Sequence, residues 1–274
     1  MRRTRLRTVI YLSVIAVLAV ISWRLLRPIE PSYQGKPLSA WLDYYYNNGV
    51  AYPRPEGWEA AKARAEIALR KMGTNSLPTL IKMMGSRERS RDPDGIVRAR
   101  GGAPSAPPTR TDNDNHWRAV YAFEVLGQDA KPAVPALIHL LNDRDPDVRS
   151  AAAVACGWIG PPARDAVPAL VERYLRDTSD EVGLYAAQSL GWIQPEPAMV
   201  LPAYVENLER GNGKRWLTYD ETFLVLGKLG QKARTAVPVL LRILNDPNDP
   251  TYHQAAARAL KKIDPEAAAK AGID

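Results

Sequence analysis

The chain has 274 residues, of which 46% are hydrophobic and 24% charged, so it can bury one or two globular cores and is not wholly disordered. Its formal net charge is +7, but six of its 37 basic residues lie in residues 1–27, which hold no acidic residue. The rest has 31 basic against 30 acidic residues, a balance that does not favour a nucleic-acid partner. A single cysteine, Cys156, excludes an intramolecular disulfide framework and a cysteine-rich zinc site.

The first element in chain order is an uncharged apolar stretch, Val9 to Trp23, with four arginines before it and Arg24 and Arg27 after it. No small-residue cleavage site follows this stretch, so residues 8–26 are expected to form an uncleaved transmembrane signal anchor. A cleaved signal peptide is the alternative. Because arginine is denser before the stretch, we expect a single-pass protein of the cytoplasmic membrane with a cytoplasmic N-terminus. The remainder is expected on the extracytoplasmic side.

After this anchor (residues 1–27), the sequence divides into a linker at 28–36, a repeat region at 37–264 and a C-terminal tail at 265–274. The repeat region is interrupted at 85–114 by thirty residues with six arginines, five acidic residues and almost no bulky apolar side chain. Such a segment cannot bury a core, so we expect a disordered surface loop. Its basic character leaves an anionic partner open as an alternative.

A first apolar stripe, spaced i, i+3, i+4 and i+7, recurs six times in the repeat region and predicts one face of a helix each time. In five stripes the second residue is proline, which the first turn of a helix tolerates because its missing N–H would have no partner there. The stripes begin at Leu38, Leu77, Val134, Val167, Leu201 and Val237.

A second stripe, spaced i, i+4, i+7, i+8 and i+11, follows each first stripe and is rich in alanine. These stripes begin at Ala61, Asn115, Val148, Val182, Thr218 and Tyr252. Glycine follows four of the six, as is typical of a helix C-cap. The two stripes together predict an all-α fold, a right-handed α-solenoid of about six helical hairpins preceded by the one transmembrane helix.

Three runs of sequence carry a resemblance to a known family: Ala133 to Leu137, Leu140 to Arg149 and Ala151 to Gly160. They resemble the short bacterial HEAT repeats, of the type also found in phycobilin lyases, and the likeness extends over about residues 37–264. It departs from the motif at Gly183, Tyr219 and His253, where arginine would stand. The resemblance implies an armadillo-like scaffold that binds proteins more often than an enzyme.

Residues that carry chemistry are sparse. His116, His139 and His253 are more than four residues apart and none precedes a glutamate, so no metal site is expected. Cys156 falls on a small-residue stripe, where a thiol packs inertly. No nucleophile motif or glycine-rich phosphate loop is present, and no cofactor is expected. We therefore expect a protein that is not an enzyme.

The residue one place after the start of each second stripe is often polar. We expect His116 and His253 to bond the adjacent turn, and Arg149 to pair with an aspartate of its own or a neighbouring repeat. Aromatic side chains beside the second stripes mark a candidate binding face, because Trp, Tyr and Arg are typical of interface anchors. Trp158 and Trp192 share one repeat position, where padding between hairpins is the alternative.

The resulting hypothesis is a membrane-anchored HEAT-repeat scaffold that binds a protein or peptide partner on its concave face. Its candidate protein-binding residues are Arg149, Tyr185, Trp192 and Tyr219. One alternative is a lyase or other enzyme that uses the same face, which a deep pocket with two or more titratable groups would favour. Another is a purely structural repeat protein, whose concave face would lack a contiguous apolar patch.

Overall fold

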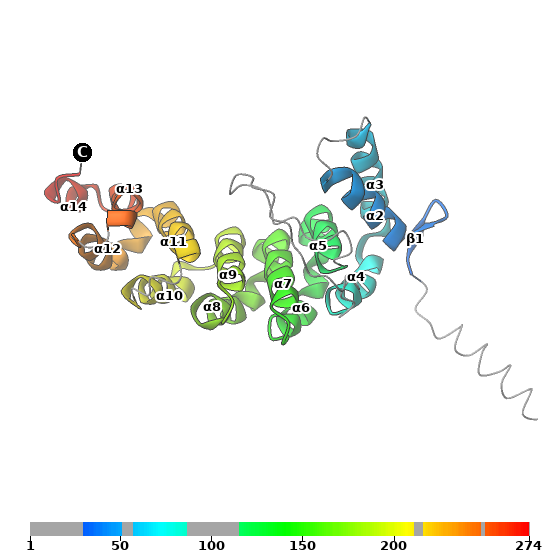
Figure 1. The fold of residues 1–274 in the computed structure, drawn as a ribbon, viewed down its shortest axis with the longest axis horizontal. Helices are drawn as coiled ribbons and strands as arrows, with labels where there is room; N and C mark the ends of the chain where they lie inside the picture. Colours follow the sequence, from blue (N-terminus) through cyan, green and yellow to red (C-terminus); the bar gives the residue numbers. More distant parts are fainter. Residues whose placement is uncertain (1–29, 51–56, 87–114, 211–215, 248–249, 274) are drawn as a thin grey trace, which may run out of the picture.

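The chain folds into an arc of paired α-helices, and the computed structural model describes residues 30–50, 57–86, 115–210, 216–247 and 250–273 (Figure 1). The first helices of the pairs are α2 (Leu38–Val50), α4 (Leu77–Met84), α6 (Val134–Leu140), α8 (Val167–Arg176), α10 (Pro197–Arg210) and α12 (Val237–Leu244). The second helices are α3 (Trp58–Met72), α5 (Asn115–Leu126), α7 (Pro146–Ile159), α9 (Asp180–Ile193), α11 (Trp216–Leu229) and α13 (His253–Ile263). The helical solenoid predicted from the two stripes is confirmed.

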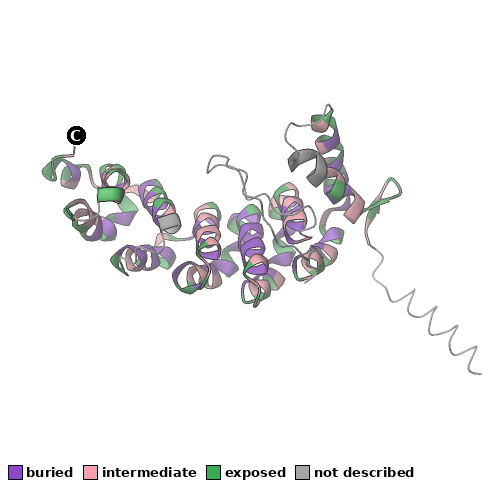
Figure 2. Cartoon of the chain, viewed as in Figure 1, coloured by how far each residue is buried: buried purple, intermediate pink, exposed green. Residues whose placement is uncertain are grey.

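The two stripes form a continuous core between the helices of each pair and between neighbouring pairs (Figure 2). In α7, for example, Val148, Ala152, Ala155, Cys156 and Ile159 all have no exposed area. Proline lies at the first or second position of α4, α6, α8 and α12, as predicted. Helix α10 differs, because it begins four residues before its stripe, at Pro197, and Pro202 lies inside it.

Short 3-10 helices join most second helices to the next pair: η1 (Gly73–Ser76), η2 (Gly127–Ala133), η3 (Pro161–Ala166) and η4 (Gly230–Ala236). A further one, η5 (Pro250–Tyr252), precedes α13. Asp145 caps α7, because its side chain accepts a hydrogen bond of 3.0 Å from the backbone N–H of Asp147. At the other end of α7, Gly160 has φ 72°, a conformation that favours glycine.

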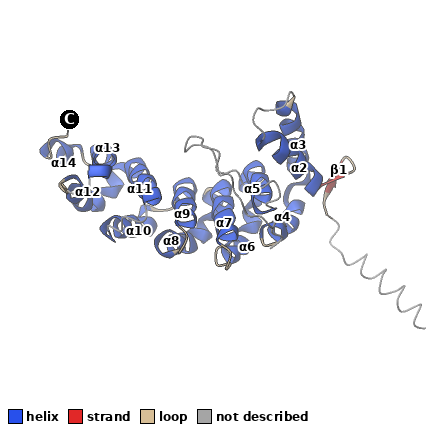
Figure 3. Cartoon of the chain, viewed as in Figure 1, coloured by secondary structure: helices blue, strands red, loops and turns tan. Residues whose placement is uncertain are grey.

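Both ends of the described arc carry structure where the sequence suggested a linker and a tail. Strands β1 (Ser32–Tyr33) and β2 (Lys36–Pro37) form a small hairpin in front of α2 (Figure 3). Trp41 ties this hairpin down, since its indole N–H donates to the carbonyl oxygen of Tyr33 at 3.1 Å. At the C-terminal end, α14 (Pro265–Lys270) is capped by the side chain of Asp264, which accepts from the N–H of Ala267 at 3.1 Å.

Within the part of the chain that the structure describes, no helix is both long enough and apolar enough to span a membrane. The longest, α3, has 15 residues and would extend about 23 Å, short of a hydrocarbon core of about 30 Å. On this finding the predicted single-pass localisation in the cytoplasmic membrane is wrong. The segment predicted to cross it, residues 8–26, lies outside the described residues, as do residues 87–114 of the predicted loop.

Candidate functional site

The second helices of the pairs line the concave side of the arc. Helices α5, α7, α9, α11 and α13 lie on the inner side, and α4, α6, α8, α10 and α12 lie on the outer side (Figure 1). Side chains at the same position of consecutive second helices therefore lie side by side on this face. The concave face is the natural place for a contact surface that spans several repeats.

A stacked pair of indoles joins two of the inner helices, α7 and α9. The rings of Trp158 on α7 and Trp192 on α9 have centroids 5.0 Å apart and an interplanar angle of 25°. They remain 37% and 41% exposed, so they only partly cover each other. Gly157 makes the stacking possible, because a Cβ at that position would lie 2.5 Å from Cε3 of Trp192. We call Trp158 and Trp192 the tryptophan pair.

Two further aromatic rings, from the two helices that flank α7, contact each other. Trp117 on α5 and Tyr185 on α9 have ring centroids 5.4 Å apart, and both are half-buried. Because α7 lies between α5 and α9 (Figure 1), these rings meet across it. Every residue of α7 from Val148 to Gly157 is buried. Tyr185 itself stays partly exposed.

Arg149 lies beneath this face and holds neighbouring repeats together. It is 7% exposed, and its Nε and Nη2 donate to the carboxylate of Asp177, between α8 and α9, at 2.8 and 2.7 Å. Its Nη1 donates to the carbonyl oxygens of Asp143 and Arg144 at 2.9 and 3.1 Å. The predicted pairing of Arg149 with an aspartate of a neighbouring repeat is confirmed. With its donors engaged inside the protein, this guanidinium is not displayed on the surface.

Opposing effects act on the carboxyl group of Asp177. Burial raises its pKa, but hydrogen bonds from Arg149 and from the N–H of Ser179, together with the charges of Arg149 and Arg173, outweigh burial. The net result is a pKa below the ordinary value. Asp177 therefore stays ionised and paired at neutral pH.

Tyr219 also lies below the face. It is 7% exposed, its ring packs against Tyr252 with centroids 4.9 Å apart, and its hydroxyl donates to the carbonyl oxygen of Asn207 at 3.3 Å. His116 and His253 occupy the same repeat position and bond the carbonyl oxygens of Met84 and Asp246. This position points back to the end of the preceding first helix, whose last carbonyl groups lack partners within the helix. That geometry is why Arg149 and Tyr219 are buried.

Of the four residues predicted from the sequence, Tyr185 and Trp192 are partly exposed on the inner helix α9, whereas Arg149 and Tyr219 are buried. Two further large apolar side chains of the inner helices are exposed but were not among the four predicted residues. They are Trp158 on α7 and Leu224 on α11, and Leu224 is 47% exposed. Their positions within the repeat could have indicated this exposure. Trp158 lies ten residues after the start of its second stripe, as Trp192 does, and Leu224 lies six residues after its own.

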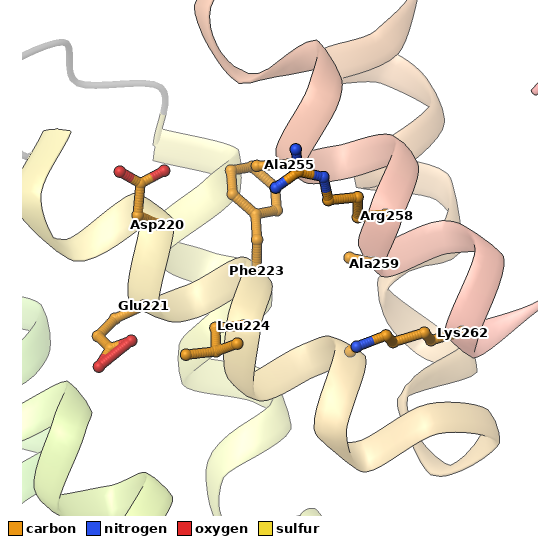
Figure 4. A pocket seen from close by; sticks show the side chains of 9 residues that line it. Asp220, Glu221, Phe223, Leu224, Ala255, Arg258, Ala259 and Lys262 are labelled. Carbon is orange, nitrogen blue, oxygen red and sulfur yellow. The ribbon is translucent and has the colours of Figure 1, made fainter.

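The concave face becomes charged between α11 and α13. A groove of about 440 Å³ lies there, with Arg258 and Lys262 extending from α13 toward α11 (Figure 4). Asp220 and Glu221 lie on α11, but their carboxylates point away from α13 (Figure 4). Burial raises the pKa of Glu221, an effect that the charge of Lys228 and a hydrogen bond with Gln188 partly offset. The acids and bases of this groove do not converge on one point.

In the part of the chain that the structure describes, groups suited to metal or covalent chemistry are not clustered. No cluster of three or more His, Cys, Asp or Glu side chains that could hold a metal ion occurs among the described residues. Cys156 has no exposed area, and burial raises its pKa to about 12, so the thiol is protonated at neutral pH. What the arrangement offers is an aromatic contact surface beside a charged groove.

Comparison with known proteins shows a similarity for the middle of the chain. A family model described as HEAT repeats matches residues 109–191, which span α5 to α8 and most of α9. A search of curated proteins found no match to the chain.

Similar solved structures include an engineered protein with 20% identity and a TM-score of 0.48, covering 86% of this chain and 91% of that one. A designed armadillo repeat protein in complex with the peptide (KR)4 has 15% identity and a TM-score of 0.45, covering 81% of this chain and 99% of that one. A second engineered protein has 18% identity and a TM-score of 0.44, covering 86% and 64%. Over the matched residues, the stacked helical pairs of this solenoid are similar to HEAT repeats.

Proposed function

We propose that this protein is a non-enzymatic scaffold that binds a protein or peptide segment on its concave face. The observation that carries the proposal is the tryptophan pair, whose large rings are 37% and 41% exposed on two neighbouring helices of the inner side. Exposed aromatic surface of this size on a concave face is typical of a contact site, because a partner that covers it gains the hydrophobic free energy of burial.

The proposed contact surface consists of Trp158, Trp192, Tyr185 and Leu224. These residues lie on three consecutive second helices, so one bound segment can touch all of them. Arg149 and Tyr219 belong to the proposal as supports that hold the helices in register. The apolar tryptophan pair argues against a purely structural array. The divergent carboxylates of Asp220 and Glu221 do not favour an enzyme that would use the charged groove.

The partner that fits is an extended or helical segment with an apolar anchor residue and a charged end. The anchor would cover the tryptophan pair, and the charged end would reach the groove between α11 and α13. Anchors of this kind contribute most of the binding free energy of an interface, while surrounding contacts exclude water.

A displayed peptide library, selected on the immobilised full chain, tests the proposal. Selected peptides should bind the variant Trp192→Ala more weakly by roughly 1–3 kcal/mol, measured by titration calorimetry. Met199→Ala is the matched control, because Met199 is 42% exposed but lies on the outer helix α10. Equal affinity for Trp192→Ala and the unaltered protein would show that the concave face is not the binding site.

A further inference from the structure

One repeat position changes its chemistry along the inner helices. It lies ten residues after the start of each second stripe, so its side chains on consecutive helices are neighbours (Figure 1). From α7 to α13 the position is held in turn by Trp158, Trp192, Lys228 and Lys262, and all four side chains are exposed. We call these four residues the inner row. Its aromatic half is followed by a cationic half.

Lys262 repeats the contact that orients Trp192. A Cβ at Gly227 of α11 would lie 3.4 Å from Cδ of Lys262, much as a Cβ at Gly157 would lie against Trp192. The methylene stem of Lys262 therefore reaches α11, and its ammonium group extends along the groove between α11 and α13 (Figure 4). Such a stem packs while its charge stays in water. The direction of this lysine is thus set by packing against the neighbouring helix.

Arg258 brings a second positive charge to the same groove. It lies one turn before Lys262 on α13, is exposed and extends toward α11 (Figure 4). Among the described residues, neither side chain is paired with a carboxylate. Asp220 and Glu221 line the groove, but their carboxylates point away from α13 (Figure 4). Lys228 differs, because its charge interacts with that of Glu221. Arg258 and Lys262 are therefore the cations that an incoming acidic group would meet.

The spacing of the inner row selects a backbone conformation for a bound segment. Packed helices have axes about 8–10 Å apart, so neighbouring members of the row repeat at about that distance. A polyproline II segment has three residues per turn and rises about 3.1 Å per residue, so its side chains return to one side after about 9.3 Å. A β-strand returns after about 6.6 Å, which is too short. Every third residue of a polyproline II segment therefore meets the next helix.

We propose that the partner segment is acidic beside its anchor and lies in polyproline II conformation across α9, α11 and α13. An apolar anchor residue covers the tryptophan pair. Carboxylate side chains three and six residues away from the anchor meet Lys228 and Lys262, and Arg258 contacts the second of them. This inference rests on the function proposed above and adds the chemistry of the partner. Complementary charges of this kind select partners and speed association more than they add affinity.

Short labelled proline-rich peptides, titrated against the full chain by fluorescence anisotropy, test this inference. Each has one tryptophan and glutamates three and six residues from it, in one or the other chain direction, and the tighter peptide is used. It should bind the variant Lys262→Glu about fivefold more weakly. A peptide with lysines in place of the glutamates should bind Lys262→Glu more tightly than it binds the unaltered protein.

The matched control is Lys261→Glu. Lys261 is also exposed in the last turn of α13 but lies outside the inner row, so its replacement makes the same change in net charge and in the helix end. It should change peptide affinity by less than about twofold. Circular dichroism checks that both variants are helical. The inference is overturned if the two variants weaken binding equally, or if Lys262→Glu weakens glutamate and glutamine peptides alike.

The spacing has a separate test. Peptides with glutamates two and four residues from the tryptophan should bind no better than peptides with glutamine, and equal affinity for the two glutamate spacings would overturn the polyproline II register. Trp192→Ala separates this inference from the proposed function. If it weakens glutamate and glutamine peptides while Lys262→Glu weakens neither, the concave face binds peptides but the acidic partner is wrong. Unchanged affinity for Trp192→Ala would overturn the function itself.

Discussion

The joint between α7 and α9 and the joint between α9 and α11 use the same repeat positions but are filled differently. At the first, Gly157 lets Trp192 lie against Trp158, and the hydroxyl of Ser189 donates to the carbonyl oxygen of Ala153 at 2.7 Å. At the second, Gly191 faces only a methyl group of Val225. Lys228 stands where α9 has Trp192, and a recess opens nearby. One tightly filled joint is thus followed by a looser one.

This difference shows how a uniform backbone scheme produces distinct surfaces. Glycine nine residues after the start of the second stripe allows close approach in α7, α9 and α11 alike, at Gly157, Gly191 and Gly227. The residue that follows it decides the result. Tryptophan covers the neighbouring glycine and builds an aromatic ridge, whereas lysine extends into solvent and leaves the joint open.

The largest expected effect comes from breaking the buried pair that fixes the first joint. Asp177→Ala should lower the free energy of unfolding by about 3–5 kcal/mol, because it leaves the buried guanidinium of Arg149 without its counter-charge. Urea unfolding followed by circular dichroism measures this. Arg234→Ala is the control, since its pairing with Asp264 is exposed and should contribute about 0–1 kcal/mol. Equal losses for the two variants would contradict the structural role of Asp177.

A smaller effect should follow from adding one methyl group at each joint. Gly157→Ala places a Cβ 2.5 Å from Trp192 and 2.8 Å from the hydroxyl oxygen of Ser189, so it should cost about 1–3 kcal/mol of stability. In Gly191→Ala, the added Cβ would contact only Val225, at 3.3 Å. Alanine also favours a helix by up to about 1 kcal/mol over glycine. This variant should be neutral or stabilising in thermal unfolding. A comparable loss in both variants would show that the two joints are equally tight.

The smallest effect is the pH dependence that Asp177 contributes. Its pKa is below the ordinary value in the folded protein, so its stabilising contribution is complete above about pH 4 and is lost as the pH falls through the folded pKa. Urea midpoints measured from pH 7 to about pH 2 should therefore fall more steeply for the unaltered protein than for Asp177→Asn. Parallel curves for the two proteins would show that Asp177 does not contribute to the loss of stability at acid pH.

Much of the fold follows from local pattern. The two stripes predict the helices because the period of apolar residues, the first-turn prolines and the terminal glycines all agree, as Val148 to Gly160 illustrates. The start of α10 was not predictable from its stripe, because Pro197 can begin a helix as well as Leu201 can.

The candidate site was only partly predictable. Sequence spacing places Trp192 and Tyr219 on second helices, but whether each faces solvent depends on the neighbouring repeat. Trp192 lies over Gly157 of the preceding pair and stays exposed, whereas Tyr219 is enclosed by Tyr252 of the following one. The recess at the α9–α11 joint is lined by residues of three helices, which no single segment encodes.

Because Cys156 is buried, its reactivity reports whether the central repeat is open or closed. Alkylating reagents attack the thiolate and need access to sulfur, and in the folded protein the thiol offers neither. Modification must therefore wait until α7 separates from its neighbours. The sequence holds one cysteine, so alkylation of the whole chain occurs only at Cys156. The alkylation rate therefore measures how often α7, the helix that carries Trp158, opens.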